Sequence, residues 1–212
     1  MDPVSPHRGG LVPNGPLSLP ARLCLLAWDL DPTRAAPVVR AGALADLARR
    51  GLLVDDDGIA TPRDLDSRTG DPALDGLLEL VSESFPHDWR TWVTLHARHT
   101  LDAVREHLVA EGVLRAEKHR VLGVFPSVDH VLVDRARADA LRTEAHQVLS
   151  GAAVPDGTTA TTLVLAMAAD LPLPASGTVP AVPTDPGLTA ILHELETGLR
   201  GAVPAASLPK GR

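Results

Sequence analysis

Residues 101–133 constrain the fold more than any other stretch, because a helical pattern, a glycine and two β-rich runs follow one another directly. The apolar residues before the glycine lie three or four positions apart, which is helical spacing; they are Leu101, Val104, Leu108 and Val109. Gly112 then suits a helix C-cap, since glycine enters the left-handed region without a Cβ clash. The runs 121–125 and 128–133 are joined at Pro126-Ser127, which predicts a β-hairpin.

A weaker copy of this unit lies upstream, at residues 38–61. There an apolar helical stripe ends at Gly51, a short aliphatic strand follows, and residues 55–58 have the composition of a tight hairpin turn. A helix followed by a hairpin is also how a winged-helix domain ends, so a protein-interaction or DNA-binding module is an alternative. Its recognition helix would be residues 39–50, where the basic residues after the first turn are only Arg49 and Arg50, at the very end.

The composition favours closely packed helices. Hydrophobic residues make up 44% of the 212 residues but aromatic residues only 2%, so the core is built from leucine, valine and alanine. The formal charge of −7 argues against general nucleic-acid binding, which usually rests on a basic surface. Cys24 is the single cysteine, which excludes a disulfide within the chain and predicts a buried, inert thiol.

One helical domain is expected over residues 17–171. Residues 1–16 and 201–212 are expected to be disordered, residues 172–187 carry five prolines and suit a linker, and residues 188–200 form a last amphipathic helix. Within the domain the helical patterns are at residues 17–30, 39–50, 72–83, 89–99, 101–111, 134–149 and 159–171, with a proline-held loop at residues 29–37. No apolar run reaches the length of a membrane span, so we expect a cytoplasmic protein.

Catalysis has no positive support in these residues. No nucleophile elbow, dinucleotide fingerprint or phosphate-binding loop is present. His96 and His99 could share one helix face, but a zinc site needs further ligands that no spacing supplies. We therefore expect no enzyme, no metal site and no cofactor.

The arginines are more informative. Residues 98–142 contain eight basic side chains against seven acidic ones, which makes this the basic part of an acidic chain. Arginine suits phosphate because its planar fork forms two charged hydrogen bonds at once. Arg40 and Arg105 could converge on one anion if the two helix–glycine units pack together. The alternative, which spacing alone favours, is that both are surface residues in weak ion pairs with neighbours such as Asp102 and Glu106.

Four segments, in this order and spacing, resemble one known family. They read VRAGALADLARRGLL, TGDPALDGLL, VREHLVAEGVLRAEKHRVLGVF and TTLVLAMAADL. Over residues 17–171 the chain resembles the Golgi phosphoprotein 3 family, including its actinobacterial members. The resemblance implies a mainly α fold: a central helical bundle, surrounding amphipathic helices, and one or two short β-hairpins, of which one protrudes.

The same resemblance implies a peripheral membrane protein that binds the headgroup of phosphatidylinositol 4-phosphate in a shallow basic pocket. Arg40 and Arg105 match two pocket arginines, whereas a third falls at Asp102, which would repel phosphate. The pocket tryptophan falls within residues 31–37, which hold no aromatic residue, and Trp28 nearby is expected to be buried. The hairpin residues that would touch the bilayer are Val124, Phe125 and Val128.

The leading expectation is thus a cytoplasmic protein, peripheral on the inner face of the membrane. Its partner would be an anionic phospholipid resembling phosphatidylinositol 4-phosphate, with no nucleic acid, and with oligomerisation through the hairpin left open. The winged-helix module stays the alternative.

Overall fold

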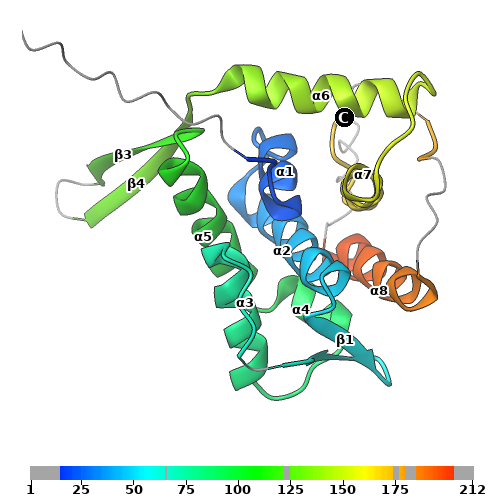
Figure 1. The fold of residues 1–212 in the computed structure, drawn as a ribbon. Coiled ribbons are helices and arrows are strands. Elements are labelled where there is room, and N and C mark those ends of the chain that lie inside the picture. Colours follow the sequence, from blue (N-terminus) through cyan, green and yellow to red (C-terminus); the bar gives the residue numbers. More distant parts are fainter. Residues whose placement is uncertain (1–14, 65, 122–124, 174–176, 180–184, 203–212) are drawn as a thin grey trace, which may run out of the picture.

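The computed structural model describes residues 15–64, 66–121, 125–173, 177–179 and 185–202, with only the backbone described between 119 and 127. This part of the chain holds eight helices and two antiparallel hairpins (Figure 1), which confirms the mainly α fold. The helices are α1 Leu19–Leu26, α2 Pro32–Arg49, α3 Pro72–Glu83, α4 Trp89–Thr94, α5 Ala97–Ala110, α6 Arg135–Leu149, α7 Gly157–Ala168 and α8 Pro186–Ala202. The strands are β1 Leu53–Asp56, β2 Ile59–Pro62, β3 Leu114–Val121 and β4 Phe125–Leu132.

Helix α2 forms the centre of the bundle. It contacts α1, α3, α4, α5, α7 and α8, and every residue from 35 to 47 is buried. Most of these residues are alanine, glycine or valine, so neighbouring helices approach closely without large side chains between them. The low aromatic content of the chain is therefore matched by close helix packing, as the composition predicted.

Helix α1 packs tightly against α2 at Gly42. A Cβ atom added there would lie 2.6 Å from Leu23 Cδ1 and 3.2 Å from Pro20 Cα. One turn further along α2, the Asp46 carboxylate accepts a hydrogen bond from the backbone N–H of Leu19 at 3.1 Å. Asp46 thereby satisfies a donor at the start of α1, where no side chain of α1 itself does so.

The prediction of a loop at residues 29–37 is wrong for most of that segment, because α2 begins at Pro32. Asp31 caps the helix by accepting from the backbone N–H of Thr33 at 2.8 Å, and a proline in the first turn loses no helical hydrogen bond. Pro37 does interrupt the helical ladder, yet it is buried together with its neighbours. Burial of this apolar segment outweighs the local signal of the prolines.

The single helix expected at residues 89–99 is also wrong, because α4 ends at Thr94 and α5 begins at Ala97. His96 stands between them with a φ of 53°, an uncommon conformation for a residue with a side chain. Its backbone carbonyl accepts a hydrogen bond from Arg40 Nη2 at 2.7 Å. This contact from α2 fixes the corner, and no local sequence pattern could reveal it.

The β3–β4 hairpin projects from the body beyond the end of α5 (Figure 1). Gly112, with a φ of 75°, follows α5 as predicted. The predicted turn at Pro126-Ser127 is wrong, because both residues pair within β4, opposite Arg120 and His119. A proline is tolerated there since each strand of a two-stranded sheet has one free edge. Of the predicted bilayer contacts, Val124 and the side chain of Phe125 lie outside the described residues, whereas Val128 is 47% exposed.

Helix α8 packs on the same core as the preceding helices. Its buried residues Ile191, Leu195 and Leu199 lie within the main hydrophobic cluster, and α8 contacts α2, α4 and α7. It also starts earlier and ends later than residues 188–200. Residues 1–14 and 203–212, which were expected to be disordered, lie outside the described part of the chain.

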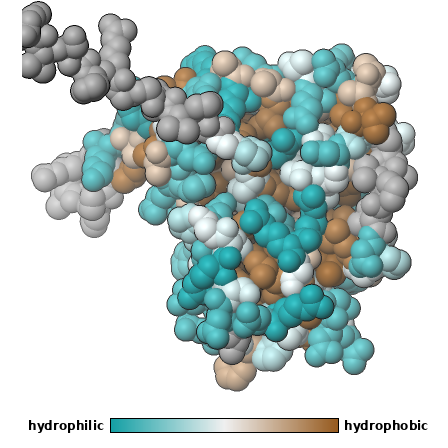
Figure 2. Space-filling view, in the orientation of Figure 1, coloured by the Kyte–Doolittle hydropathy of each residue, from teal (hydrophilic) through white to brown (hydrophobic). Residues whose placement is uncertain are grey.

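The face drawn in Figure 2 carries no continuous apolar band. Figure 2 shows hydrophilic residues over most of the visible face, with apolar residues in small separate groups. Within the described ranges, no helix combines the length and the apolar character that crossing a membrane requires.

Gly42→Ala should lower the free energy of unfolding by about 1–2 kcal/mol, because the new methyl group overpacks the α1–α2 contact. Gly76→Ala in α3 is the matched control, since nothing lies within 4 Å of a Cβ atom there. That change should stabilise the protein by about 0.5–1 kcal/mol through helix propensity. Urea unfolding measures both variants, and equal effects of the two substitutions would contradict the close α1–α2 packing.

Candidate functional site

A cluster of three half-buried residues lies where the bundle meets the hairpin. Trp28 follows α1, Arg105 lies on α5, and His130 lies on β4. The Arg105 guanidinium carbon stands 5.8 Å from the centre of the Trp28 ring, a cation–π contact that holds the arginine in place. The expectation that Trp28 is buried was wrong, because the helix that precedes it ends at Leu26 and the ring turns toward α5.

Arg105 is a cation without an ion-pair partner among the described residues, and its Nε atom is buried without a protein acceptor. Its charge acts on two neighbours. Burial raises the pKa of the Cys24 thiol to about 11, and Arg105 partly opposes that rise. The pKa of His130 is lowered, first by burial and then by Arg105, so His130 is largely neutral at pH 7 and adds little charge to the site.

An open cavity of about 560 Å³ lies between α5 and the hairpin; we call it the α5–hairpin cavity. The residues from α5 fall on one helical stripe, and those from the hairpin share one face of the two strands. The lining residues are Arg98, Asp102, Glu106 and Val109 on α5, Ala116 and Lys118 on β3, and Val128 and His130 on β4. His130 also borders a second cavity of about 380 Å³ on the side of α6, which Trp28 lines as well. His130 therefore borders both open spaces and Trp28 borders one of them, whereas Arg105 lies behind these two side chains and lines neither.

Asp102, the position where the resemblance implied a pocket arginine, is paired within the protein. Arg98 Nε donates to its two carboxylate oxygens at 3.0 and 3.3 Å, one helical turn away. Both side chains are about half exposed, so this pair is weak, but it offsets the repulsion that Asp102 alone would exert on phosphate. Sequence reasoning did not single out Arg98, although the four-residue spacing from an acid on a helix was its signal.

Arg40 is placed differently from Arg105. It has no exposed surface, and its Nε and Nη1 atoms lack protein hydrogen-bond partners. Burial lowers the pKa of Arg40 to about 10, so it stays protonated at neutral pH. Its one acceptor, the carbonyl of His96, precedes Arg105 by nine residues, roughly 13 Å along a helix axis. The structure thus places Arg40 in the interior at the start of α5 and Arg105 near the surface further along.

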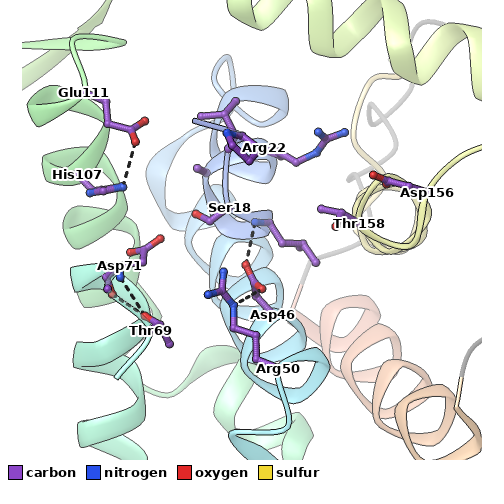
Figure 3. A pocket seen from close by; sticks show the side chains of 15 residues that line it. Ser18, Arg22, Asp46, Arg50, Thr69, Asp71, His107, Glu111, Asp156 and Thr158 are labelled. Atoms are coloured by element: carbon purple, nitrogen blue, oxygen red, sulfur yellow. Dashed lines mark hydrogen bonds and ion pairs between the residues drawn. The ribbon is translucent and has the colours of Figure 1, made fainter. Parts of the chain in front are cut away.

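A further cavity, of about 460 Å³, opens on another face (Figure 3). Its charged residues largely pair with one another. Asp46 accepts from Arg50 Nε at 2.9 Å, and His107 lies 3.5 Å from Glu111 on the opposite wall. Asp156 and Thr158, at the start of α7, form the remaining side. Because the acidic side chains here neutralise the basic ones, this cavity is a weaker candidate for an anion.

The histidine pair does not extend to a metal cluster. The rings of His96 and His99 stack with their centres 5.5 Å apart. Within the described part of the chain, no group of three or more histidine, cysteine, aspartate or glutamate side chains could hold a metal ion.

The fold and the site define a class: a helical protein with a projecting hairpin, which holds a cation beside an open polar cavity. The chain belongs to the Golgi phosphoprotein 3 (GPP34) family, whose family model matches residues 19–203. The match runs past residue 171 and so includes α8. A search among curated proteins found no match.

Arg40→Met should raise the free energy of unfolding by about 1 kcal/mol, because it replaces an unpaired buried charge by an apolar chain of similar length. The His96 carbonyl keeps an acceptor role, since the backbone N–H of His99 also donates to it at 3.0 Å. Arg40→Ala, the size control, should destabilise by about 2–3 kcal/mol because it leaves a cavity. Thermal unfolding distinguishes them, and a large loss of stability in Arg40→Met would show that the charge itself stabilises the fold.

Proposed function

We propose that this protein binds membranes peripherally, by holding the anionic headgroup of a phospholipid at Arg105. The observation that supports this proposal is that Arg105 has no ion-pair partner among the described residues and is held over Trp28, which lines an open cavity. Arginine at such a position can give an incoming phosphate two charge-assisted hydrogen bonds. Membership of the Golgi phosphoprotein 3 family supports the proposal, and the family implies a headgroup like that of phosphatidylinositol 4-phosphate.

The hairpin supplies the second attachment. A single headgroup contact gives weak binding, and stable attachment needs a second, apolar or basic, signal. Val128 is exposed on the projecting hairpin, and Lys118, its partner on β3, is exposed on the same face. The net charge of −7 makes the rest of the surface unfavourable near an anionic bilayer, so the hairpin face that carries Lys118 and Val128 would turn toward the cytoplasmic leaflet.

Arg40 supports this site without touching the headgroup. By binding the carbonyl of His96 it fixes the corner from which α5 starts, and α5 carries Arg105. We therefore assign Arg40 a positioning role, in place of the direct contact that the family resemblance implied.

The winged-helix alternative loses its recognition helix. Residues 39–50 fall on α2, which is buried from Ala35 to Leu47 by six other helices. A helix covered on all sides cannot enter a DNA groove.

Arg105→Ala should weaken binding to anionic vesicles by a factor of about five, the contribution of one cation near the surface, or about 1 kcal/mol. Arg105→Lys should bind with an affinity between those of the wild type and Arg105→Ala, because lysine keeps the charge but loses the planar fork. Vesicle flotation at two salt concentrations measures this, and the wild-type binding should fall as salt rises.

The matched control is Arg200→Ala on α8, which removes an exposed arginine that pairs with Glu196 away from the hairpin (Figure 1). Circular dichroism checks that each variant is folded. If Arg105→Ala and Arg200→Ala lose binding equally, the loss reflects only the change in net charge. That result would contradict a site at Arg105.

Val128→Asp should also weaken vesicle binding, by a factor of about five, since it places a charge where the hairpin meets the bilayer. Val154→Asp is the control, because Val154 is 91% exposed in the connection between α6 and α7, away from the hairpin. If both variants bind as the wild type does, the hairpin does not contact the membrane.

A further inference from the structure

His130 lies where the two open spaces beside the hairpin meet. It lines the α5–hairpin cavity and also the second cavity, of about 380 Å³, on the side of α6, and no other described residue lines both. Histidine is the side chain whose ordinary pKa lies nearest to neutral pH, so its charge can change within the range of cellular pH. A positive charge on this ring therefore acts on an anion in either space.

Charged groups face the His130 ring from the elements around it. From α5 and β4 these groups are Arg105, which opposes protonation of the ring, and Asp102, Glu106 and Asp129, which favour it. The other charged residues that line the two cavities are Arg98 and Lys118 in the first, and Asp29, Arg135, Asp139 and Arg142 in the second. Burial is the largest influence and also disfavours the charged ring, so the pKa of His130 lies below its ordinary value.

An anion that binds beside these groups changes the charge balance at His130. It offsets the charge of Arg105, which opposes protonation, and it attracts a proton to the ring directly, so binding raises the pKa of His130. Linkage makes this effect reciprocal, and the anion therefore binds more tightly when the ring is protonated. The gain in affinity begins as the pH falls through the pKa of the bound state, and it is complete below the pKa of the free state.

We propose that His130 makes membrane attachment pH-dependent: mild acid places a positive charge on its ring, between the two cavities, and thereby strengthens binding of the anionic headgroup. This inference rests on the proposed function and adds a means of regulation to the same site. The negative potential of an anionic bilayer also concentrates protons at its surface, so the ring meets a lower pH there than in the bulk solution.

Vesicle flotation of the full chain at about pH 7.5 and about pH 5.5, on either side of the ordinary pKa of histidine, provides the test. The vesicles contain phosphatidylglycerol in phosphatidylcholine, because a phosphodiester keeps its single charge over this range whereas a phosphate monoester titrates within it. The wild type should bind about fivefold more tightly at the lower pH, the contribution of one added cation near an anionic surface. His130→Gln should remove most of this increase.

His146→Gln is the matched control. His146 is exposed in the last turn of α6, at the end of that helix away from the hairpin (Figure 1). The substitution removes the same titratable group from the chain, but it should leave the ratio of the affinities at the two pH values as it is in the wild type. Circular dichroism at both pH values checks that each variant is folded.

A pH titration of the free protein, followed by NMR of the histidine rings, tests the coupling without a lipid. In Arg105→Met the pKa of His130 should rise toward its ordinary value, because the opposing charge is gone. An unchanged pKa would show that the two side chains are not coupled, and it would overturn the linkage on which the proposal rests.

The vesicle outcomes separate this inference from the proposed function. If the wild type binds equally at both pH values, or if His130→Gln keeps the full increase, the pH-dependence does not come from His130 and anionic lipid binding still stands. If the wild type binds no vesicle at either pH, the proposed function fails and this inference fails with it.

Discussion

The hydrogen bond from Arg40 to the carbonyl of His96 joins the centre of the bundle to the element that carries the site. It starts on α2, the helix at the centre of the bundle, and ends at a residue in the left-handed conformation between α4 and α5. The direction in which α5 leaves this corner determines where Arg105 meets Trp28 and where the hairpin projects. A charged group without an ion pair is unfavourable in such an interior, which is why we propose a positional task for Arg40 and not a stabilising one.

The site at the end of this chain of contacts is open and mildly basic. Arg105 is held by an aromatic ring in place of a carboxylate, and this leaves its charge available to an incoming anion. The neighbouring carboxylates Asp102 and Glu106 limit how much negative charge the site can accept. The weak headgroup binding and the hairpin contact that we propose would suit a protein that associates reversibly with a surface. The rest of the chain is acidic, which disfavours other orientations of the protein on an anionic bilayer.

Features set by local chemistry were predictable from the sequence. Asp71 caps α3 with Pro72 as its first residue, Gly112 ends α5 in the left-handed region, and Asp57 with Gly58 turns the first hairpin. Each depends on residues within one turn of the chain. The low aromatic content favoured closely packed helices, whereas the family resemblance implied the mainly α fold with its hairpin and placed Arg105 among the candidates.

Features set by contacts between distant segments were not predictable. The break at His96 depends on Arg40, which lies 56 positions earlier. The position of Trp28 over Arg105 depends on how α1 and α5 pack, and nothing in the apolar run before Trp28 indicates it. The register that pairs β3 with β4 likewise includes charged residues and a proline. A prediction from the composition of each run therefore put the turn at the wrong residues.

Backbone amide hydrogen exchange with and without anionic vesicles tests the central claim most directly, because it maps the contacted surface without altering a residue. Protection on vesicle binding should appear at three places: the turn that contains Trp28, the stretch of α5 that contains Arg105, and strands β3 and β4. Helix α8 should exchange as it does in solution. Protection centred on the cavity that Arg50 and His107 line, with the hairpin unchanged, would contradict the account and move the site to the other face of the protein.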